Sequence, residues 1–212
     1  MERLAIFDID FTLTSKETSI ELYKYMVKKK PWLISHLPRH LITLLLYGTK
    51  IYDEKKTKQA FLRFLDGVKE KDLQILVKDF YKDKLSKIIY EDAINMIKKL
   101  KSEGCKVYLI SASAEFYLNE LYNIKEVDKI IGTKFKIENG AFKPLMEGTN
   151  CKGEEKVRRL MEELKKDNIE VDFKNSYMFS DSLADLPLLK LVGKGYLINY
   201  KKKHDLEILK WK

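Results

Sequence analysis

Short apolar runs along the chain predict the strands of a sheet. Arg3–Phe7 indicates a buried strand of a parallel sheet, and Cys105–Ile110 indicates a second. Further strands are predicted at residues 129–132, 177–180 and 195–199, with a hairpin at 134–144 that turns at Asn139-Gly140. Helical periodicity at residues 92–102 and 156–164 predicts amphipathic helices between the runs. This alternation indicates an α/β fold with a parallel sheet.

The longest helical stretch interrupts this alternation. From Lys16 to Ile89 the pattern is helical throughout, and no strand signal occurs within it. One helix face is defined by apolar residues at i, i+3, i+4, i+7 and i+8, which are Leu73, Leu76, Val77, Phe80 and Tyr81. A second helix, Glu54–Leu65, ends before the stop signal Asp66-Gly67. The stretch predicts a helical insertion after the first strand.

The most apolar segment of the chain, Pro31–Tyr47, allows two interpretations. Pro38-Arg39-His40 interrupts it, so it is too short to span a bilayer, which needs about 20 apolar residues. It could lie in a membrane interface, with Trp32 and Lys28–Lys30 at the level of the headgroups and residues 28–47 against an anionic membrane. The interpretation we favour is a buried helix of the insertion.

Positive charge is concentrated in the same helical stretch. The 212 residues carry a formal net charge of +9. Between Thr14 and Ile89 there are 17 Lys and Arg against 9 Asp and Glu, whereas the rest of the chain has 24 against 23. This is either a solvated basic surface or a segment that attracts anionic substrates or anionic lipid. Because no nucleic-acid-binding motif accompanies the charge, we expect no nucleic-acid partner.

The composition is that of a globular chain with a sizeable core, with 45% hydrophobic and 34% charged residues. The two cysteines, Cys105 and Cys151, are far apart and form no CxxC pair; Cys105 opens an apolar run and is expected to be a buried thiol. No signal peptide is recognisable, because the N-terminus is itself the first strand. These features predict a cytoplasmic protein, with peripheral membrane contact as an addition.

Pairs of acidic residues follow two of the predicted strands. Asp8 and Asp10 come directly after the first strand, and Asp181 and Asp185 follow the strand at 177–180. The carboxyl ends of strands form the ligand crevice of open α/β sheets. Two carboxylates held close together repel unless a cation such as Mg²⁺ lies between them or one keeps its proton, as a general acid does. The alternative is that these residues only cap the following helices.

Four motifs occur in order at the predicted strand ends and helix starts. They are Asp8-Ile9-Asp10-Phe11-Thr12-Leu13, Ser111 after the second long strand, a lysine at the start of the helix near residue 156, and Ser180-Asp181-Ser182-Leu183-Ala184-Asp185-Leu186-Pro187. This order resembles the haloacid dehalogenase (HAD) superfamily of phosphohydrolases, in its phosphoserine phosphatase-like subfamily. The resemblance implies a Rossmann-like doubly wound parallel sheet core at residues 1–14 and 90–212, with an inserted all-helical cap domain at 15–89.

The resemblance also assigns roles to the motif residues. Asp8 would be the nucleophile that becomes an aspartyl-phosphate, and Asp10 would protonate the leaving oxygen and then activate water. A lysine would neutralise the nucleophile and the phosphoryl group; Lys156 fits better than Lys152, because it directly precedes the apolar-periodic part of the helix. The implied cofactor is Mg²⁺, held by Asp8, by the carbonyl of Asp10, by Asp181 and, through ordered water, by Asp185.

Substrate contacts are expected around the phosphoryl group and in the cap. Ser111, with Ala112 and Thr12, would contact the phosphoryl group. Glu17 lies nine residues after the nucleophile, where phosphoserine phosphatases carry a glutamate that contacts the substrate amine, and Arg63 is a candidate partner for a carboxylate. Glu17 could equally be only a polar residue of the first helical turn.

The substrate itself stays open at this point. Phe11 and the segment Ala112–Phe116 depart from phosphoserine phosphatases, which carry a small polar residue and glycines there. The first hypothesis is therefore hydrolysis of a small phosphorylated metabolite or of a lipid headgroup phosphate, and phosphoserine phosphatase proper is the alternative. A non-catalytic module that binds phosphate or anionic lipid is a further alternative, as is a phosphotransferase that excludes water.

Overall fold

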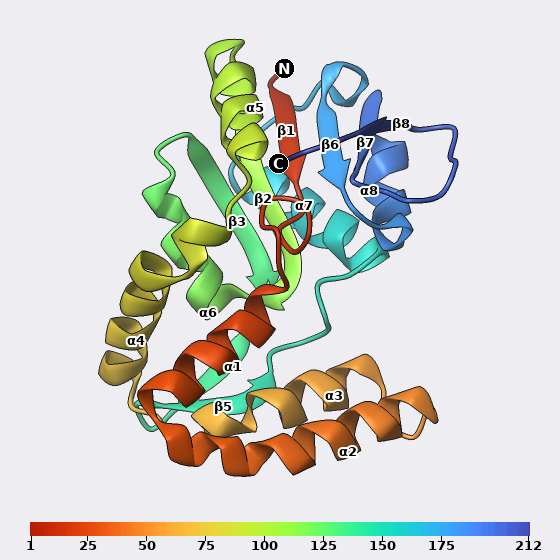
Figure 1. Ribbon diagram of the computed structural model, residues 1–212. Helices are drawn as coiled ribbons and strands as arrows, with labels where there is room; N and C mark the ends of the chain where they lie inside the picture. The colour runs from red at the N-terminus through yellow and green to blue at the C-terminus, as the bar shows by residue number, and fades with distance from the viewer.

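The computed structural model describes residues 1–212 and contains a six-stranded parallel sheet (Figure 1). Its strands are β1 (Arg3–Phe7), β2 (Cys105–Ala114), β3 (Val127–Thr133), β6 (Tyr177–Ser180), β7 (Lys194–Ile198) and β8 (Glu207–Leu209). Their order is β3-β2-β1-β6-β7-β8, so the sheet grows in opposite directions from β1. Open sheets bind ligands at the carboxyl ends of the strands beside such a switch point, here β1 and β6.

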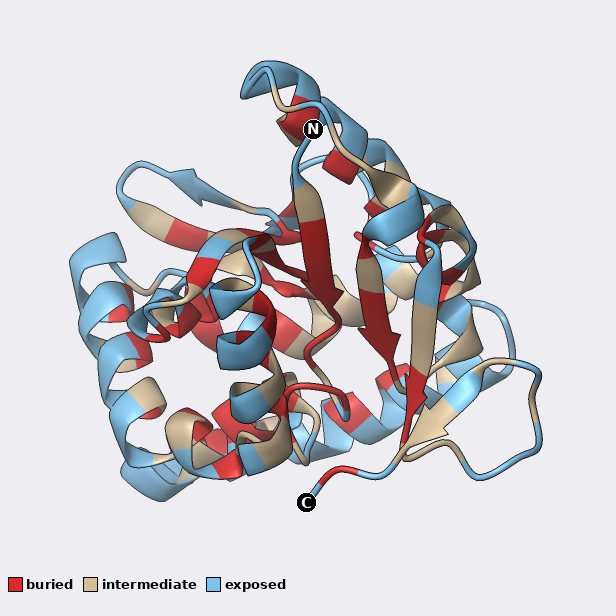
Figure 2. Cartoon of the chain, turned by 90° about the horizontal axis from the view of Figure 1, so that it is seen from above, coloured by how far each residue is buried: buried red, intermediate tan, exposed pale blue.

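Helices cover both faces of this sheet. They are α5 (Glu91–Ser102), α6 (Glu115–Leu118), α7 (Glu154–Lys166) and α8 (Leu186–Leu191), with the 3-10 helices η4 (Asn119–Asn123), η5 (Phe173–Asn175) and η6 (Leu183–Asp185). Alternate residues of β1 enter two separate cores, Ala5 and Phe7 on one face and Leu4 and Ile6 on the other. Figure 2 shows the central strands buried between these layers. The predicted doubly wound α/β fold is therefore confirmed.

The insertion after β1 consists of helices beyond the carboxyl ends of the strands (Figure 1). They are α1 (Thr18–Lys29), η1 (Pro31–His36), α2 (Leu37–Gly48), α3 (Glu54–Phe61), η2 (Leu62–Leu65), α4 (Glu70–Asp83) and η3 (Leu85–Ile88). The prediction that residues 16–89 are helical throughout is confirmed. That residues 15–89 form a separate cap domain stays a proposal.

A hairpin from the second half of the chain packs on this insertion. Its antiparallel strands are β4 (Phe135–Glu138) and β5 (Ala141–Met146). The turn residues Asn139 and Gly140 have φ of 52° and 72°, as a two-residue type I′ turn requires, so the predicted hairpin is confirmed. The amide of Phe142 donates to Val68 over 2.8 Å, and the amide of Gly67 donates to Phe142 over 3.0 Å. We propose that the cap includes this hairpin.

Two parts of the sheet extend beyond the sequence prediction. β2 continues through Ala114 rather than ending at Ile110. The edge strand β8 is absent from the prediction, because its three residues show no apolar run. Pairing with β7 and the buried Trp211 hold this end of the chain in place. The Trp211 ring lies 5.6 Å from Phe179 and 6.3 Å from Phe7, measured between ring centroids.

The apolar segment 31–47 is not the buried helix that we favoured from the sequence. Its buried residues are Leu33, His40 and Thr43, whereas most of its large apolar side chains are exposed. The His40 ring lies 4.5 Å from that of Tyr23 and 4.7 Å from that of Phe61. Only this side of η1 and α2 meets other helices, which leaves the opposite side without a packing partner. The prediction was wrong because the segment is apolar on more faces than the fold covers.

Candidate active site

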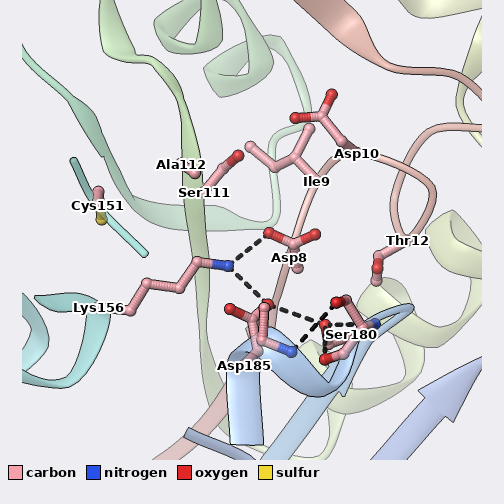
Figure 3. A network of polar contacts seen from close by, with 12 residues as sticks. Asp8, Ile9, Asp10, Thr12, Ser111, Ala112, Cys151, Lys156, Ser180 and Asp185 are labelled. Atoms are coloured by element: carbon pink, nitrogen blue, oxygen red, sulfur yellow. Dashed lines mark hydrogen bonds and ion pairs between the residues drawn. The ribbon is translucent and has the colours of Figure 1, made fainter. Parts of the chain in front are cut away.

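A buried lysine and two carboxylates meet at the carboxyl end of β1 (Figure 3). Lys156, in the first turn of α7, donates hydrogen bonds to Oδ1 of Asp8 and Oδ2 of Asp185, each over 2.7 Å. Its side chain is 2% exposed. Burial alone would lower the pKa of Lys156, but the two carboxylates outweigh burial and raise that pKa above its usual value. Lys156 is therefore charged where it touches Asp8.

Lys152, the second candidate for this role, lies elsewhere. Its side chain is exposed, and its ammonium pairs with Glu54 of α3. Gly153, with a φ of 58°, turns the chain between Lys152 and the start of α7. The structure therefore brings Lys156 to Asp8 and directs Lys152 toward the helical insertion.

Asp8 is held between neighbouring strands. Its amide donates to the carbonyl of Phe179 in β6 over 3.0 Å. Burial raises the pKa of Asp8 to about 7; Lys156 opposes this rise, and the charges of Asp185 and Asp10 add to it. Such a poorly solvated carboxylate suits both a nucleophile and a ligand for a cation.

Asp181 lies in the loop beside Asp8, and Thr12 ties the two loops together. The amide of Asp181 donates to Oγ1 of Thr12 over 2.8 Å. Thr12 is fully buried and holds these two loops together; its contact with the phosphoryl group stays a prediction. Burial, with the charge of Asp185, raises the pKa of Asp181 to about 6. Asp8 is therefore a buried carboxylate and Asp181 a half-buried one, and burial raises the pKa of each.

This donor set fits a hard divalent cation held by few protein ligands. No group of three His, Cys, Asp or Glu side chains in the protein could hold a metal ion. The carboxylate of Asp185 instead accepts hydrogen bonds from Lys156 and from Oγ of Ser180, the latter over 2.9 Å. Asp8 and Asp181 are the remaining carboxylates. Mg²⁺ commonly binds through one or two carboxylates and completes its shell with other oxygens, so the residues fit Mg²⁺.

Asp10 points away from Lys156, toward the insertion (Figure 3). Its Oδ1 accepts a hydrogen bond from the amide of Thr18 over 2.6 Å, and its Oδ2 accepts one from Oγ of Ser113 over 2.6 Å. The Thr18 hydroxyl in turn lies 3.1 Å from the hydroxyl of Tyr117. The Asp10 carboxylate is therefore not placed as a metal ligand with Asp8, and its predicted metal contact is left to its backbone carbonyl.

Ser111 projects from β2 toward the loop that carries Asp8 and Asp10 (Figure 3). Its Oγ accepts a hydrogen bond from the amide of Ser113 over 3.0 Å, which leaves its proton to donate to a ligand. The predicted strand end at Ile110 is wrong, because β2 continues through Ala114, and α6 after it has only four residues. Any anion contact here would use the Ser111 hydroxyl and strand amides, not a helix N-terminus.

A second lysine, which sequence reasoning missed, enters from α3. Lys58 Nζ donates to the carbonyl of Ala112 over 2.6 Å and to Oδ1 of Asn150 over 2.8 Å. Burial lowers the pKa of Lys58 to about 8, against the raising effect of Asp10, Glu54 and Glu17. A signal was present in the sequence. Phe61 and Leu62 follow Lys58 by three and four residues, so Lys58 lies on the same side of its helix as these apolar residues.

Lys58 and Glu17 line a small pocket beside Asp10. The pocket has a volume of about 40 Å³, and Ser113 and Tyr117 also line it. Glu17 caps α1, since its carboxylate accepts hydrogen bonds from the amide of Ile20 over 2.7 Å and from Oγ of Ser19 over 2.6 Å. Burial and the charge of Asp10 raise the pKa of Glu17. Both the predicted substrate contact and a helix-cap role are therefore compatible with its position.

Arg63 lies outside this pocket. Its side chain is exposed and lines a separate cavity of about 530 Å³ with Tyr52, Gln59 and Lys143. The neighbouring residues Leu62 and Phe64 turn into the core, which directs Arg63 outward. The structure therefore does not bring Arg63 to the small pocket, which Lys58 lines instead, and the role of Arg63 as a partner for a substrate carboxylate stays a prediction.

Lys58→Met is expected to raise KM about tenfold or more for substrates with an anionic group beside the phosphate ester, with a small effect on kcat. The charge of Lys58 is lost above a pKa of about 8, so the wild-type KM for these substrates should also rise as the pH increases through 8. Steady-state kinetics between pH 6.5 and 9 would measure both effects. Lys56→Met, at an exposed position of the same helix, is the matched control. Equal KM values for the two variants would contradict the role of Lys58.

The sequence matches a known family over most of its length. The family model described as haloacid dehalogenase-like hydrolase matches residues 5–190, a range that contains Asp8, Lys156 and Asp185. A histidinol-phosphatase of Neisseria meningitidis serogroup C is 25% identical over 209 residues, which are 94% of this chain and 91% of that protein. The match therefore extends over the helical insertion as well as the sheet.

Solved structures share the same fold. A protein of unknown function from Bordetella pertussis Tohama I superposes with a TM-score of 0.85 at 21% identity, over 95% of this chain and 92% of that chain. A substrate-bound phosphoserine phosphatase superposes with a TM-score of 0.66 at 17% identity, over 98% of this chain and 93% of that chain. At these identities the superpositions show the fold, including the helices inserted after β1.

Proposed function

We propose a mechanism and a substrate class from the premise that this chain belongs to the haloacid dehalogenase-like hydrolase family and is a phosphomonoester hydrolase of its phosphoserine phosphatase-like type. The reaction is Mg²⁺-dependent hydrolysis through an aspartyl-phosphate on Asp8. The observation that carries this proposal is the buried contact of Lys156 with Asp8 and Asp185. It holds an ammonium against a carboxylate at the strand end where the family motif has its nucleophile.

In the first step, a carboxylate oxygen of Asp8 attacks phosphorus, and the bond between phosphorus and the alcohol oxygen breaks. Asp10 supplies the proton that the leaving oxygen takes up. The carboxyl group of Asp10 lies against Ser113 at the edge of the small pocket, which is where the alcohol would be bound. Lys156 and the Ser111 hydroxyl stabilise negative charge on the phosphoryl oxygens.

In the second step, a water molecule attacks the phosphorus of the aspartyl-phosphate. Asp10 accepts the proton of this water, inorganic phosphate leaves, and the carboxylate of Asp8 is restored. Mg²⁺, held by Asp8 and Asp181, would supply positive charge that offsets the repulsion between the nucleophile and the phosphate. Asp185 keeps Lys156 in place through both steps, because its carboxylate is anchored by Ser180.

For the substrate we infer a small phosphorylated metabolite or a lipid headgroup phosphate. The small pocket beside Asp10 supports this, because its volume of about 40 Å³ admits only a small group next to the ester oxygen. An amino acid phosphate is a specific alternative: Glu17 would face its ammonium group, and Lys58 would face its carboxylate. The presence of these two opposite charges in one pocket favours this alternative.

Phosphate release from a panel of esters tests the proposal. The panel holds phosphoserine, histidinol phosphate, glycerol phosphate and phosphatidylglycerophosphate in micelles. We expect Mg²⁺-dependent release from at least one ester, loss of release to the background rate with EDTA, and full recovery with excess Mg²⁺. Asp181→Asn should raise the Mg²⁺ concentration needed for half-maximal rate, whereas Asp128→Asn, near the amino ends of the strands, should not. Unchanged release after metal removal would contradict the proposed cofactor.

A further inference from the structure

The outer side of η1 and α2 exposes an unusual number of large apolar side chains. We call this the apolar face; its members are Trp32, Ile34, Leu37, Leu41, Ile42, Leu44, Leu45, Tyr47 and Ile51, each between 42% and 67% exposed. Leu37, Leu41, Leu44 and Leu45 recur at i, i+4, i+7 and i+8, so they lie on one side of α2. In Figure 1, α2 forms the edge of the molecule farthest from the sheet, and nothing packs beyond it.

The apolar face is not a by-product of a poorly packed helix. The opposite side of the same segment is well anchored, because Leu33, His40 and Thr43 are buried and the His40 ring contacts Tyr23 and Phe61. Monomeric proteins seldom expose contiguous apolar patches larger than about a few hundred Å² unless the patch binds something. We therefore expect a partner with an apolar surface to cover the apolar face.

The stretch of chain that carries the apolar face contains charges of one sign. Residues 22–52 contain six Lys or Arg and no Asp or Glu. Lys28, Lys29 and Lys30 precede the apolar face along the chain, Arg39 lies within it, and Lys50 follows it; all five are exposed. A partner that covers the apolar face must therefore also accept an excess of positive charge beside it.

We propose that the apolar face docks on the surface of an anionic lipid bilayer, with α2 lying in the plane of the interface. A bilayer surface supplies both requirements, an apolar boundary for the leucines and isoleucines and negative headgroups for the lysines. Trp32 and Tyr47 are residue types that favour the interfacial region. None of the helices combines the length and apolar character that crossing a membrane would require.

A second copy of the chain fits the apolar face less well. In a symmetric dimer the same patch occurs on both sides of the interface, so two sets of lysines would face each other. Lys29 already pairs with Asp83 of α4 over 3.7 Å, and no acidic residue lies between positions 22 and 52 to pair with the other lysines. The repulsion would oppose an association that the apolar side chains favour, whereas an anionic bilayer adds attraction to the same contact.

Docking would place the bilayer one helix away from the candidate active site. α2 packs directly against α3, and α3 carries Lys58 into the small pocket beside Asp10. This inference goes beyond the proposed hydrolysis and does not depend on it, because the apolar face contains no residue of the candidate site. A chain with another substrate, or with no activity, would dock in the same way.

Flotation of the full chain with vesicles tests the proposal. We expect the protein to float with vesicles of equal parts phosphatidylglycerol and phosphatidylcholine, but not with phosphatidylcholine alone, and to be released by high salt. The double variant Leu41→Gln with Leu45→Gln should lose at least tenfold in vesicle affinity. Ile75→Gln is the matched control, since Ile75 is 61% exposed on α4, outside the apolar face, and Leu41 is 60% exposed.

Other outcomes would overturn the proposal. One such outcome is that the wild-type protein floats with neither vesicle type. Another is that it floats equally with both vesicle types. If sedimentation velocity showed a dimer that the double variant abolishes, the apolar face would bind a second copy of the chain and not a bilayer. Circular dichroism and thermal unfolding of the variants establish that they fold. Hydrolysis of a soluble ester, measured in the same samples without lipid, shows separately whether the proposed enzymatic function holds.

Discussion

Asp8→Asn is expected to lower kcat for phosphate release by about 10⁴-fold or more, because an amide cannot attack phosphorus as a carboxylate does. The substitution keeps the shape of the side chain and removes a charge whose burial already raises its pKa to about 7. The fold should therefore survive, with Lys156 still paired to Asp185 over 2.7 Å. Phosphate release at saturating substrate and Mg²⁺, with thermal unfolding of the same sample, would measure both expectations.

The matched control for this variant is Asp79→Asn, at an exposed position of α4 outside the candidate site. It removes the same charge from the chain and should leave kcat unchanged. If Asp8→Asn turned over within about tenfold of the wild type, another group would be the nucleophile, and the aspartyl-phosphate mechanism would fall. Unfolding of Asp8→Asn at a much lower temperature would instead show that the charge of Asp8 holds the site together.

The parts of the molecule that the sequence predicted depend on local patterns. The first strand ends where its apolar run ends, so the position of Asp8 at the carboxyl edge of a parallel sheet follows from a few residues. The same holds for the hairpin turn at Asn139-Gly140, whose backbone conformation few other residue pairs adopt. The preference for Lys156 over Lys152 also used only a local pattern, because Lys156 directly precedes the apolar-periodic part of its helix. Its contact with Asp8 over 2.7 Å adds the geometry that the sequence lacked.

Features that depend on how helices pack were not predictable in this way. Lys58 and Arg63 are five residues apart, which places their side chains about 140° apart around a helix. In the structure Lys58 contacts Ala112 of β2, whereas Arg63 is exposed. The sequence pattern alone did not decide which of the two contacts the sheet, because α3 ends at Phe61 and the chain continues as a 3-10 helix. Arg63 is directed outward because its neighbours Leu62 and Phe64 are buried in the core.

The segment 31–47 is a second case in which helix packing could not be predicted from the sequence pattern. Its apolar residues exceed what one face of a helix can bury, so the sequence indicated burial without saying which residues would be left over. The fold supplies neighbours for Leu33, His40 and Thr43 and none for Leu41 or Leu45. Strand β8 is the converse case, because its position depends on the pairing partner β7 and not on a pattern of its own.

Lys156→Met is expected to lower kcat by about 10²–10³-fold, because it removes a buried charge aimed at the developing phosphoryl charge. It should also destabilise the fold by about 3–5 kcal/mol at pH 8, since Asp8 and Asp185 would share a buried site without a cation. The pKa of Asp8, which burial already raises to about 7, would lose the opposing effect of Lys156 and lie still further above its unfolded value of 3.8, so the folded state would bind an extra proton. Stability should therefore fall as pH rises, and the deficit measured by urea unfolding in EDTA should be smaller at pH 5.

A comparison of variants separates the catalytic role of Lys156 from its structural one. Lys152→Met, at the exposed lysine near the same helix start, should match the wild type in both rate and stability. Adding Asp185→Asn to Lys156→Met removes one of the two unpaired carboxylates, so part of the lost stability should return. The rate should not return with it, because the ammonium that stabilises the phosphoryl charge is still absent. Recovery of both together would mean that Lys156 acts only by holding the fold, and the proposal built on its contact with Asp8 would lose its support.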